Sequence, residues 1–340
     1  MSASFRNFLI TRILLTIPMV LILVTMVFFV MRILPGDPIR SQLGPKVSEE
    51  QAEALRERLG LDRPLYVQYF DFLYSMITFD FGNALTQGER PIREELAEKL
   101  PATIELAVPA ITFTALFGIF SGAYAAKHRK KPQDYLIRLF SIVVYSIPVF
   151  FMGLLFQIIF AVRIPILPLS GRMDTLLLTQ FESPTNFYIL DAIITQNWPA
   201  LRSALSHLVL PVVALGLVLT GPFVRLTRVN MIEMLESDFI TSGRARGLPE
   251  KKLVYRHALR NTFIPILTLI GLQFALLLAG AVLTETTFSW PGLGRYLVDR
   301  IELRDYTAVQ ATIGVFALFV GVISVVMDVL YAFIDPRIRY

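Results

Sequence analysis

The 340-residue chain contains no cysteine, few charged residues and no ionisable side chain near the middle of its long apolar runs. Without cysteine it can form neither disulfides nor thiolate-ligated metal sites. Charged residues make up only 17% of the chain, whereas hydrophobic residues make up 54% and the mean hydropathy is +0.59. This composition is typical of a protein that crosses a membrane several times.

Motifs for nucleotide binding and catalysis are also missing. No G-x-x-x-x-G-K-[S/T] phosphate loop occurs, and Gly292-Leu293-Gly294 lacks the third glycine of a dinucleotide motif, so we expect it to be a loop. The three histidines, His128, His207 and His257, do not have the spacing of metal ligands. We therefore expect a non-enzymatic chain that binds no metal and no cofactor of its own.

Six apolar runs are long enough to cross a bilayer as helices, which need about 20 residues each. We predict an all-α polytopic membrane protein, because a soluble protein with six buried helices would not show such long runs with charges only at their flanks. Five of the six runs contain proline, which predicts kinks. The predicted spans are Ile13–Ile33, Thr103–Ala126, Leu139–Val162, Ser206–Val224, Thr262–Leu283 and Ala308–Ile334.

The distribution of Lys and Arg predicts the orientation of these spans. With the N-terminus inside, the inner segments are residues 1–12, 127–138, 225–261 and 335–340. They carry 17 basic residues against six acidic ones, whereas the outer segments carry 15 against 19. We therefore expect both termini on the cytoplasmic side, and we attribute the basic pI of about 9.4 to membrane orientation and not to a nucleic-acid partner.

Few polar or aromatic residues mark the span boundaries. We expect Glu105 and Asp328 to lie near helix ends, where water solvates them, and Trp198 and Trp290 to lie in the aromatic belt. Ion-coupled carriers need ionisable groups inside the membrane, so the sequence disfavours secondary active transport. It assigns no residue to the substrate pathway, because every face of these helices is apolar.

Residues 34–100 form the largest predicted outer region, and their sequence indicates ordered helices. Ser48 and Gln51 form a capping box for a helix that Gly60 ends, and Pro64 begins a second helix with a wide aromatic face. A third helix is predicted over Ile92–Leu100. We expect a docking platform for an external partner, the alternative being a spacer, and we divide the chain into domains at 1–100 and 101–340.

The polar segment 225–261 between the fourth and fifth spans predicts a helix, a stop and a second helix. The first helix covers Asp238–Leu248 and ends at glycine, which tolerates positive φ; Pro249 then suits the first turn of the next, which runs to Arg260. Such a firm structure in an inner loop indicates a docking surface for a partner. Its residues are Asp238, Phe239, Ile240, Thr241, Ser242, Gly243, Arg244, Ala245, Arg246, Gly247 and Leu248.

This loop resembles the cytoplasmic EAA loop of type I ABC-importer permeases, with the spacing kept and the first and last triplets changed. Three more motifs resemble those of the first permease subunit in the dipeptide/oligopeptide/nickel importer family, and the resemblance covers nearly the whole length. They contain Pro35, Gly36, Asp37 and Pro38; Trp290, Pro291, Gly292 and Gly294; and Asp335, Pro336 and Arg337.

The resemblance implies the type I ABC importer permease fold, in the cytoplasmic membrane, with a second homologous permease, two cytoplasmic ATPases and an extracytoplasmic solute receptor. ATP and magnesium would be bound by the ATPases. Phe239, Ile240 and Leu248 would anchor the loop on an ATPase, Ser242, Gly243 and Ala245 would permit close approach, and Arg244 and Arg246 would pair with acids.

Peptides are the expected substrate, with nickel and oligosaccharides as alternatives within the same machinery. A stand-alone channel or carrier and a membrane scaffold without a transport role are the rival functional classes. Substrate choice would belong largely to the receptor, so this chain does not decide among the substrates.

Overall fold

The computed structural model describes residues 3–33, 48–58, 60–84 and 90–334. The chain forms two compact units, residues 1–101 with 292–326, and residues 102–291 with 327–340. Two long helices, α5 (Ile92–Lys127) and α17 (Tyr306–Ile334), contribute to both units. The only β-type pairing among the described residues is an isolated bridge between Asn83 and Pro91, so the described chain is α-helical, as predicted.

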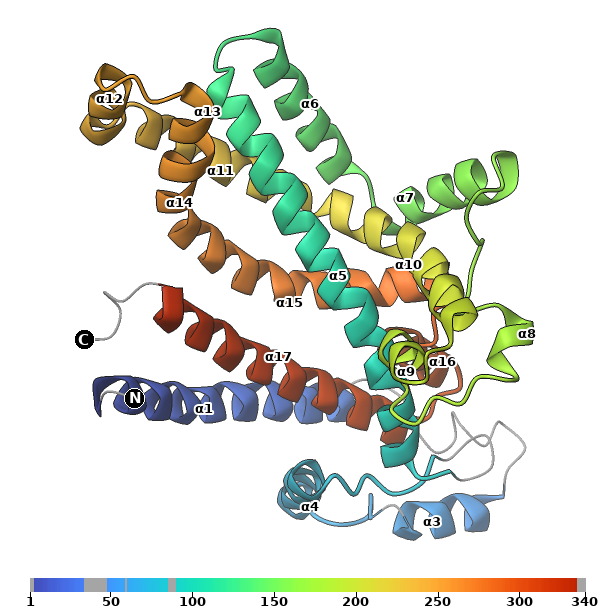
Figure 1. Ribbon diagram of the computed structural model, residues 1–340. Coiled ribbons are helices and arrows are strands. Elements are labelled where there is room, and N and C mark those ends of the chain that lie inside the picture. Colours follow the sequence, from blue (N-terminus) through green and yellow to red (C-terminus); the bar gives the residue numbers. More distant parts are fainter. Residues whose placement is uncertain (1–2, 34–47, 59, 85–89, 335–340) are drawn as a thin grey trace. The chain divides into compact units, whose positions relative to one another are not determined.

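The first unit contains two long apolar helices and, packed beside one of them, a shorter helix over Leu65–Thr78 (Figure 1). Ser48 accepts a hydrogen bond from the Gln51 amide at the start of α3, and Gly60 follows this helix with a φ of +64°, as the capping box and glycine stop predict. The helices of the first unit are α1 (Ala3–Ile33), α3 (Glu49–Arg58), α4 (Leu65–Thr78), the start of α5, α16 (Leu293–Glu302) and most of α17.

Helix α4 packs along α1, and one side of the aromatic face of α4 makes the contact. The hydroxyls of Tyr69 and Thr25 are 2.6 Å apart, and the Phe72 ring stacks on Phe28. Gly314 of α17 lies so close to Met76 that a Cβ there would meet its sulfur at 2.4 Å. The opposite side of α4, including Tyr66, Phe70 and Tyr74, is exposed.

A buried ionic cluster joins α5 to α16 within this unit. Arg300 donates from one guanidinium nitrogen to both carboxylate oxygens of Glu95, at 2.8 and 2.7 Å, and lies 3.6 Å from Asp305. The Tyr296 hydroxyl also donates to Glu95, at 2.6 Å. Burial and this hydrogen bond raise the pKa of Tyr296. All four side chains are buried, and Arg300 lies within 3.6 Å of both carboxylates.

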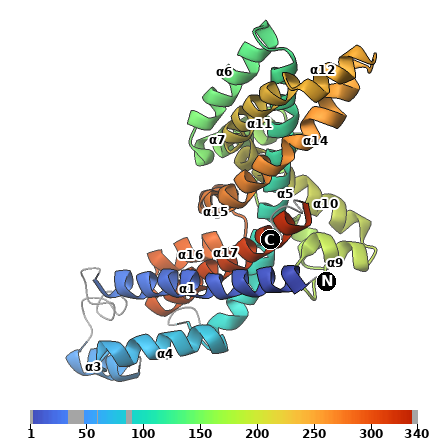
Figure 2. The same cartoon turned by 90° about the vertical axis from the view of Figure 1, so that its left-hand side faces the viewer.

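The second unit contains the middle helices and the polar segment. Its elements are the rest of α5, α6 (Pro132–Ser146), α7 (Val149–Phe156), the π-helix η1 (Gln157–Arg163), α8 (Thr175–Leu178), α9 (Tyr188–Ile194), α10 (Trp198–Val218), α11 (Thr220–Leu235), α12 (Asp238–Ala245), α13 (Glu250–Lys252), the π-helix η2 (Leu253–Ala258), α14 (Leu259–Asn261) and α15 (Phe263–Thr287). Figure 2 shows α6 beside α11, and α12 contacts α11 and η2.

Glycines permit a close contact between α5 and α11 in this unit. A Cβ on Gly118 of α5 would meet the Cβ of Phe223 at 2.3 Å, and one on Gly122 would meet the Val224 carbonyl oxygen at 2.7 Å. Only glycine permits α5 and α11 to approach this closely, because small residues let helix backbones come together.

Four helices among the described residues are long and apolar enough to cross a membrane, and the number rises to six if each of two bent helix pairs is one span. The third predicted span, Leu139–Val162, was expected to kink at proline, and the structure shows a sharper break, since α6 and the helix that follows it are bent by 103°. Pro148 lies at the break and Ile147 before it is extended, with ψ of 128°. Proline disfavours helical geometry in the preceding residue and supplies no N–H to continue the helix.

The fourth predicted span, Ser206–Val224, also has different bounds. Helix α10 begins earlier, at Trp198, and ends at Val218, and α11 starts at Thr220 and continues to Leu235. The predicted span therefore combined the end of α10 with the start of α11, because the sequence is apolar across the break between them.

We expect Arg300→Leu to lower the stability of the purified protein by about 3–5 kcal/mol, because it removes the cation that pairs with the buried Glu95. Arg63→Leu in the same unit is the control. Arg63 is exposed and lies 3.3 Å from the exposed Asp71, a weak surface pair, so its loss should change little. Thermal unfolding followed by tryptophan fluorescence measures both; equal unfolding temperatures for the two variants would contradict the structural role of Arg300.

Candidate functional site

The polar segment forms a compact helical hairpin at one end of the second unit. Helix α12 covers Asp238–Ala245 and ends three residues before the predicted Leu248. With eight residues it is about 12 Å long. Ser237 caps its start in an extended conformation, and the Ile240 and Thr241 amides donate to the Ser237 carbonyl oxygen at 3.1 Å.

The end of α12 is a Schellman motif. The Gly247 amide donates to the Arg244 carbonyl at 2.9 Å, and the Leu248 amide donates to the Gly243 carbonyl at 3.1 Å. Gly247 has a φ of +76°, a left-handed value that glycine adopts without strain. The predicted glycine stop is confirmed at Gly247. The helix ends before the predicted Leu248 because a Schellman motif places its last helical residues ahead of the glycine.

The second helix begins at Glu250, with Pro249 as its N-cap, and continues through the π-helix η2 to Asn261. A π-helical turn inserts an extra residue into the helical spacing, and such turns often occur at functional sites. Here it places Leu253, Val254 and Ala258 in the core of the hairpin, all at most 1% exposed.

A small apolar core packs α12 against other helices of the same chain. Ile240 is fully buried, packed with Met231 of α11, Leu253 of η2 and alanines of α5. A Cβ on Gly243 would meet the Leu253 side chain at 2.6 Å. The expectations that Ile240 anchors a partner and that Gly243 admits a partner's backbone are therefore wrong, because the chain's own helix η2 occupies both positions.

Arg244 also has its partner within the chain. Its guanidinium donates to both carboxylate oxygens of Glu250, at 3.2 and 2.8 Å, and to the Leu235 carbonyl at 3.4 Å. The hydrogen bond from Arg244 lowers the pKa of Glu250. This arginine links α12 to α11 and α13, contrary to the expectation that it pairs with an acid on another subunit. Arg129 and Glu236 form a second ion pair that ties the α5–α6 turn to the hairpin.

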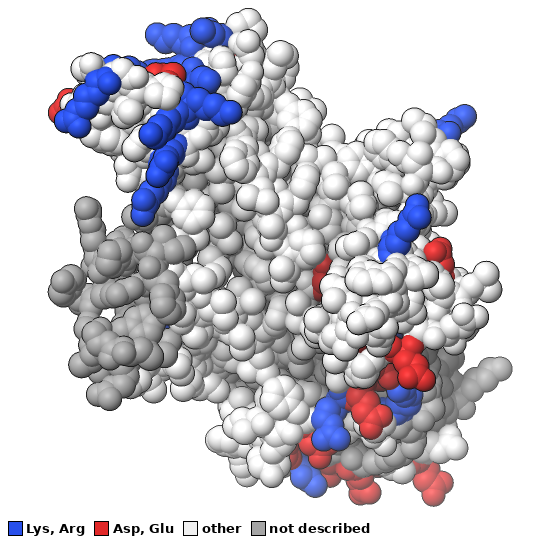
Figure 3. Space-filling model, viewed as in Figure 1, with Lys and Arg blue, Asp and Glu red and all other residues white. Residues whose placement is uncertain are grey.

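The exposed side of α12 is polar with one large apolar side chain. Phe239 is 46% exposed, although it neighbours the fully buried Ile240. The other exposed residues of the segment are Asp238, Thr241, Ser242, Arg244, Ala245, Arg246 and Gly247, whereas Leu248 is partly buried. Figure 3 shows Lys and Arg gathered at the end of the unit that carries α12 and α13. The arrangement can present Phe239 to a partner on a fixed, basic surface.

The other three sequence motifs do not belong to the α12 hairpin. Residues 35–38 and 335–337 lie outside the described residues. Trp290 is buried, and its indole N–H donates to the Ala102 carbonyl at 2.8 Å, so its predicted place in an aromatic belt is wrong. Gly292 is the N-cap of α16 and Gly294 lies within that helix, so the predicted loop over Gly292–Gly294 ends at its first residue.

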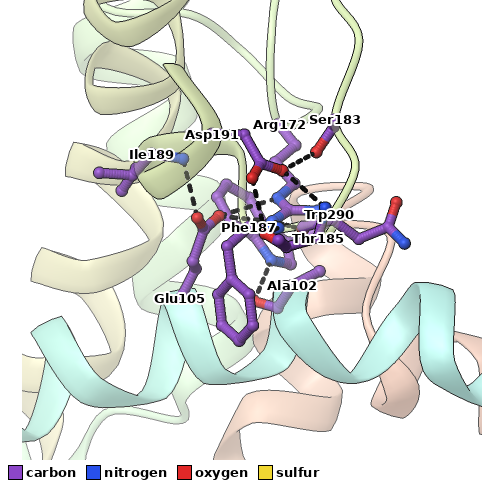
Figure 4. Close-up of polar contacts among 10 residues, drawn as sticks. Ala102, Glu105, Arg172, Ser183, Thr185, Phe187, Ile189, Asp191 and Trp290 are labelled. Atoms are coloured by element: carbon purple, nitrogen blue, oxygen red, sulfur yellow. Dashed lines mark hydrogen bonds and ion pairs between the residues drawn. The ribbon is translucent and has the colours of Figure 1, made fainter. Parts of the chain in front are cut away.

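A buried network near Trp290 escaped the sequence analysis. Arg172 donates to Glu105 through two nitrogens, at 3.1 and 2.5 Å, and to the Asn186 carbonyl at 2.6 Å (Figure 4). Its guanidinium lies 3.8 Å from the centre of the Tyr188 ring. Glu105 also accepts from the Ile189 amide at 2.9 Å. The predicted solvation of Glu105 at a helix end is wrong, because it is buried within α5 and paired with Arg172.

Asp191 stabilises the segment before α9 by accepting hydrogen bonds from it. It is fully buried and accepts hydrogen bonds from the Ser183 hydroxyl and from the amide and hydroxyl of Thr185 (Figure 4). The residues between Arg163 and Trp198 are thus held against α5 by ionic and polar contacts. The sequence offers only a weak signal for the Glu105–Arg172 pair, because the two residues are 67 positions apart and each simply lies beside an apolar run.

Two family models match the chain. The family described as "Binding-protein-dependent transport system inner membrane component" matches residues 115–340, and its N-terminal counterpart, "Binding-prot-dependent transport system membrane comp, N-term", matches residues 5–107.

Curated relatives match over nearly the full length. The di/tripeptide transport system permease protein DppB of Pseudomonas aeruginosa (strain UCBPP-PA14) is 40% identical over 336 residues, 98% of this chain and 99% of that protein. The dipeptide transport system permease protein DppB of Alkalihalophilus pseudofirmus is 39% identical, over 97% and 98%. The glutathione transport system permease protein GsiC of Escherichia coli (strain K12) is 35% identical, over 98% and 99%. The chain therefore belongs to the family of binding-protein-dependent transport system inner membrane components.

Proposed function

We propose that this chain is a permease subunit of an ATP-driven importer of small peptides and forms half of its translocation pathway. The observation that carries the proposal is the 39–40% identity, over at least 97% of the chain, to permeases named for di- and tripeptide transport. Glutathione, named for a third relative, is itself a small peptide. No described feature favours nickel or oligosaccharides.

The proposed partners are a second homologous permease, two cytoplasmic ATPases that bind ATP and magnesium, and an extracytoplasmic peptide receptor. Family membership supports partner components of an ABC transporter, and the α12 hairpin supports an ATPase as one of them. Because Ile240 and Arg244 fix the hairpin to α11, α5 and η2, a force applied to Phe239 would reach those helices without first deforming the loop.

We propose that the protein lies in the cytoplasmic membrane with both termini and the α12 hairpin on the cytoplasmic side. Its long apolar helices support the membrane location, and the excess of Lys and Arg in the inner segments supports the orientation. ATP binding would then bring the two ATPases together and shift the permease pair between inward-open and outward-open states.

Uptake by the reconstituted transporter tests the function. Proteoliposomes that contain the chain with its second permease, both ATPases and the receptor should take up a labelled dipeptide or tripeptide only when ATP is supplied on the ATPase side. An excess of unlabelled peptide should abolish the signal, whereas nickel or an oligosaccharide should leave it unchanged. Transport by the chain alone, or competition by nickel or the oligosaccharide in place of peptide, would refute the proposal.

The two neighbouring apolar residues of α12 should behave oppositely. Phe239→Ala should leave thermal unfolding unchanged but weaken ATPase association about tenfold, because exposed aromatic anchors contribute strongly at interfaces. Ile240→Ala should destabilise the protein by about 2–5 kcal/mol, because it opens a cavity in the hairpin core.

Thr241→Ala, a change at an exposed neighbour in the same helix, is the matched control for both. Association is measured by titrating labelled ATPase onto the purified permease pair. If Phe239→Ala bound ATPase normally, α12 would not dock through this side chain.

A further inference from the structure

A groove of about 940 Å³ lies between α6 and α11 and is bordered by Leu269 of α15. It belongs entirely to the second unit, and none of its lining residues belongs to the α12 hairpin. The two helices run in opposite directions along the groove, since Tyr145 near the end of α6 lies beside Gly221 near the start of α11, where a Cβ would meet the tyrosine Cβ at 3.0 Å.

One end of the groove is lined by three arginines, Arg138, Arg225 and Arg228. Arg228 is neutralised by Asp134, to which it donates at 2.6 and 2.7 Å. Neither Arg138 nor Arg225 forms an ion pair with any residue that the structure describes, although the guanidinium of Arg138 lies 5.9 Å from the centre of the Tyr135 ring. Arg138 also interacts electrostatically with Asp134, so this end has three arginines against one carboxylate among the described residues and a net positive charge.

The other end of the groove is apolar. Ile142, Tyr145, Pro222 and Leu269 line it, together with Gly221. The missing side chain of Gly221 lets α11 approach Tyr145 and the Ser141 carbonyl of α6. Ile142 and Tyr145 are four and seven residues after Arg138 on α6, so the apolar part extends from about 6 Å to about 10 Å beyond this arginine. A ligand that fits both ends needs an anionic group joined to a hydrocarbon portion.

The arginines also lie where a lipid phosphate would be. Arg138 is the last residue before the apolar run that begins at Leu139, and Arg225 is the first after the run that ends at Val224, at the boundary with the inner segments. Phospholipid head groups occupy this depth, and basic pockets between membrane helices on the cytoplasmic side bind anionic lipids.

We propose that the α6–α11 groove binds one anionic phospholipid of the inner leaflet, with its phosphate at Arg138 and Arg225 and an acyl chain against Ile142 and Tyr145. The site is separate from the α12 hairpin. It requires the proposed membrane orientation but not the proposed substrate. A soluble phosphate would leave the apolar end unfilled, and a peptide would place its polar backbone there.

Photo-crosslinking of the intact transporter complex tests this proposal. A phosphatidylglycerol with a photoreactive acyl chain should label peptides from α6 and α11, and labelling should be prevented by unlabelled phosphatidylglycerol at several-fold lower concentration than phosphatidylcholine with the same chains. Arg225→Gln should weaken the competition about fivefold, because one basic residue near an anionic lipid contributes about 1 kcal/mol. Arg225 is exposed, so the fold should tolerate the change.

Two further variants separate a specific site from general attraction. Lys131→Gln removes an exposed charge on the same side but outside the groove and should change the competition less than twofold. Ile142→Trp should block the apolar end and reduce labelling while all three arginines remain. Equal competition by phosphatidylcholine, equal effects of Arg225→Gln and Lys131→Gln, or effective competition by inorganic phosphate or a dipeptide would overturn the proposal.

Discussion

The contact between α12 and the π-helix η2 is the constraint on which the rest of the account depends. Gly243 has no side chain, so Leu253 can lie against the α12 backbone, and Ile240 fills the remaining space beside it. Arg244 and Glu250 close the same junction with hydrogen bonds. A short helix in a polar loop would otherwise be marginal, because helical stability in such elements comes from packing. The packing makes the hairpin a rigid extension of the helices beneath it.

Buried ion pairs have a similar role elsewhere in the chain. Glu105 with Arg172 fixes an irregular segment to α5, and Glu95 with Arg300 joins α5 to α16. Each pair satisfies charges that would be costly to bury alone. These contacts add to the apolar packing of the same segments, through Met173 and Ala192 in one and Leu293 and Tyr296 in the other. At the α6–α11 groove, by contrast, three arginines lie near the single carboxylate of Asp134.

The all-α membrane fold and the glycine stop at Gly247 could be predicted, because long apolar runs and a left-handed turn leave local signals in sequence. The 103° bend was missed, because hydropathy does not record direction and Pro148 was expected to kink a span, not to break it. Phe239 and Ile240 are adjacent and both apolar, so sequence alone could not tell which one faces inward. Glu105 and Trp290 were assigned to the membrane boundary because their partners, Arg172 and Ala102, are distant in sequence.

The rigidity of the hairpin can be measured directly, since a chain without cysteine permits a unique pair of spin labels. Labels at Ser242→Cys on α12 and Lys127→Cys at the end of α5 report the distance between the hairpin and the helix on which its core packs, in transporter complexes whose other subunits lack reactive cysteines. The account predicts the same narrow distance distribution in the nucleotide-free and ATP-trapped states. A distribution that shifts or broadens on ATP binding would show that the hairpin bends, and would contradict its role as a rigid connection.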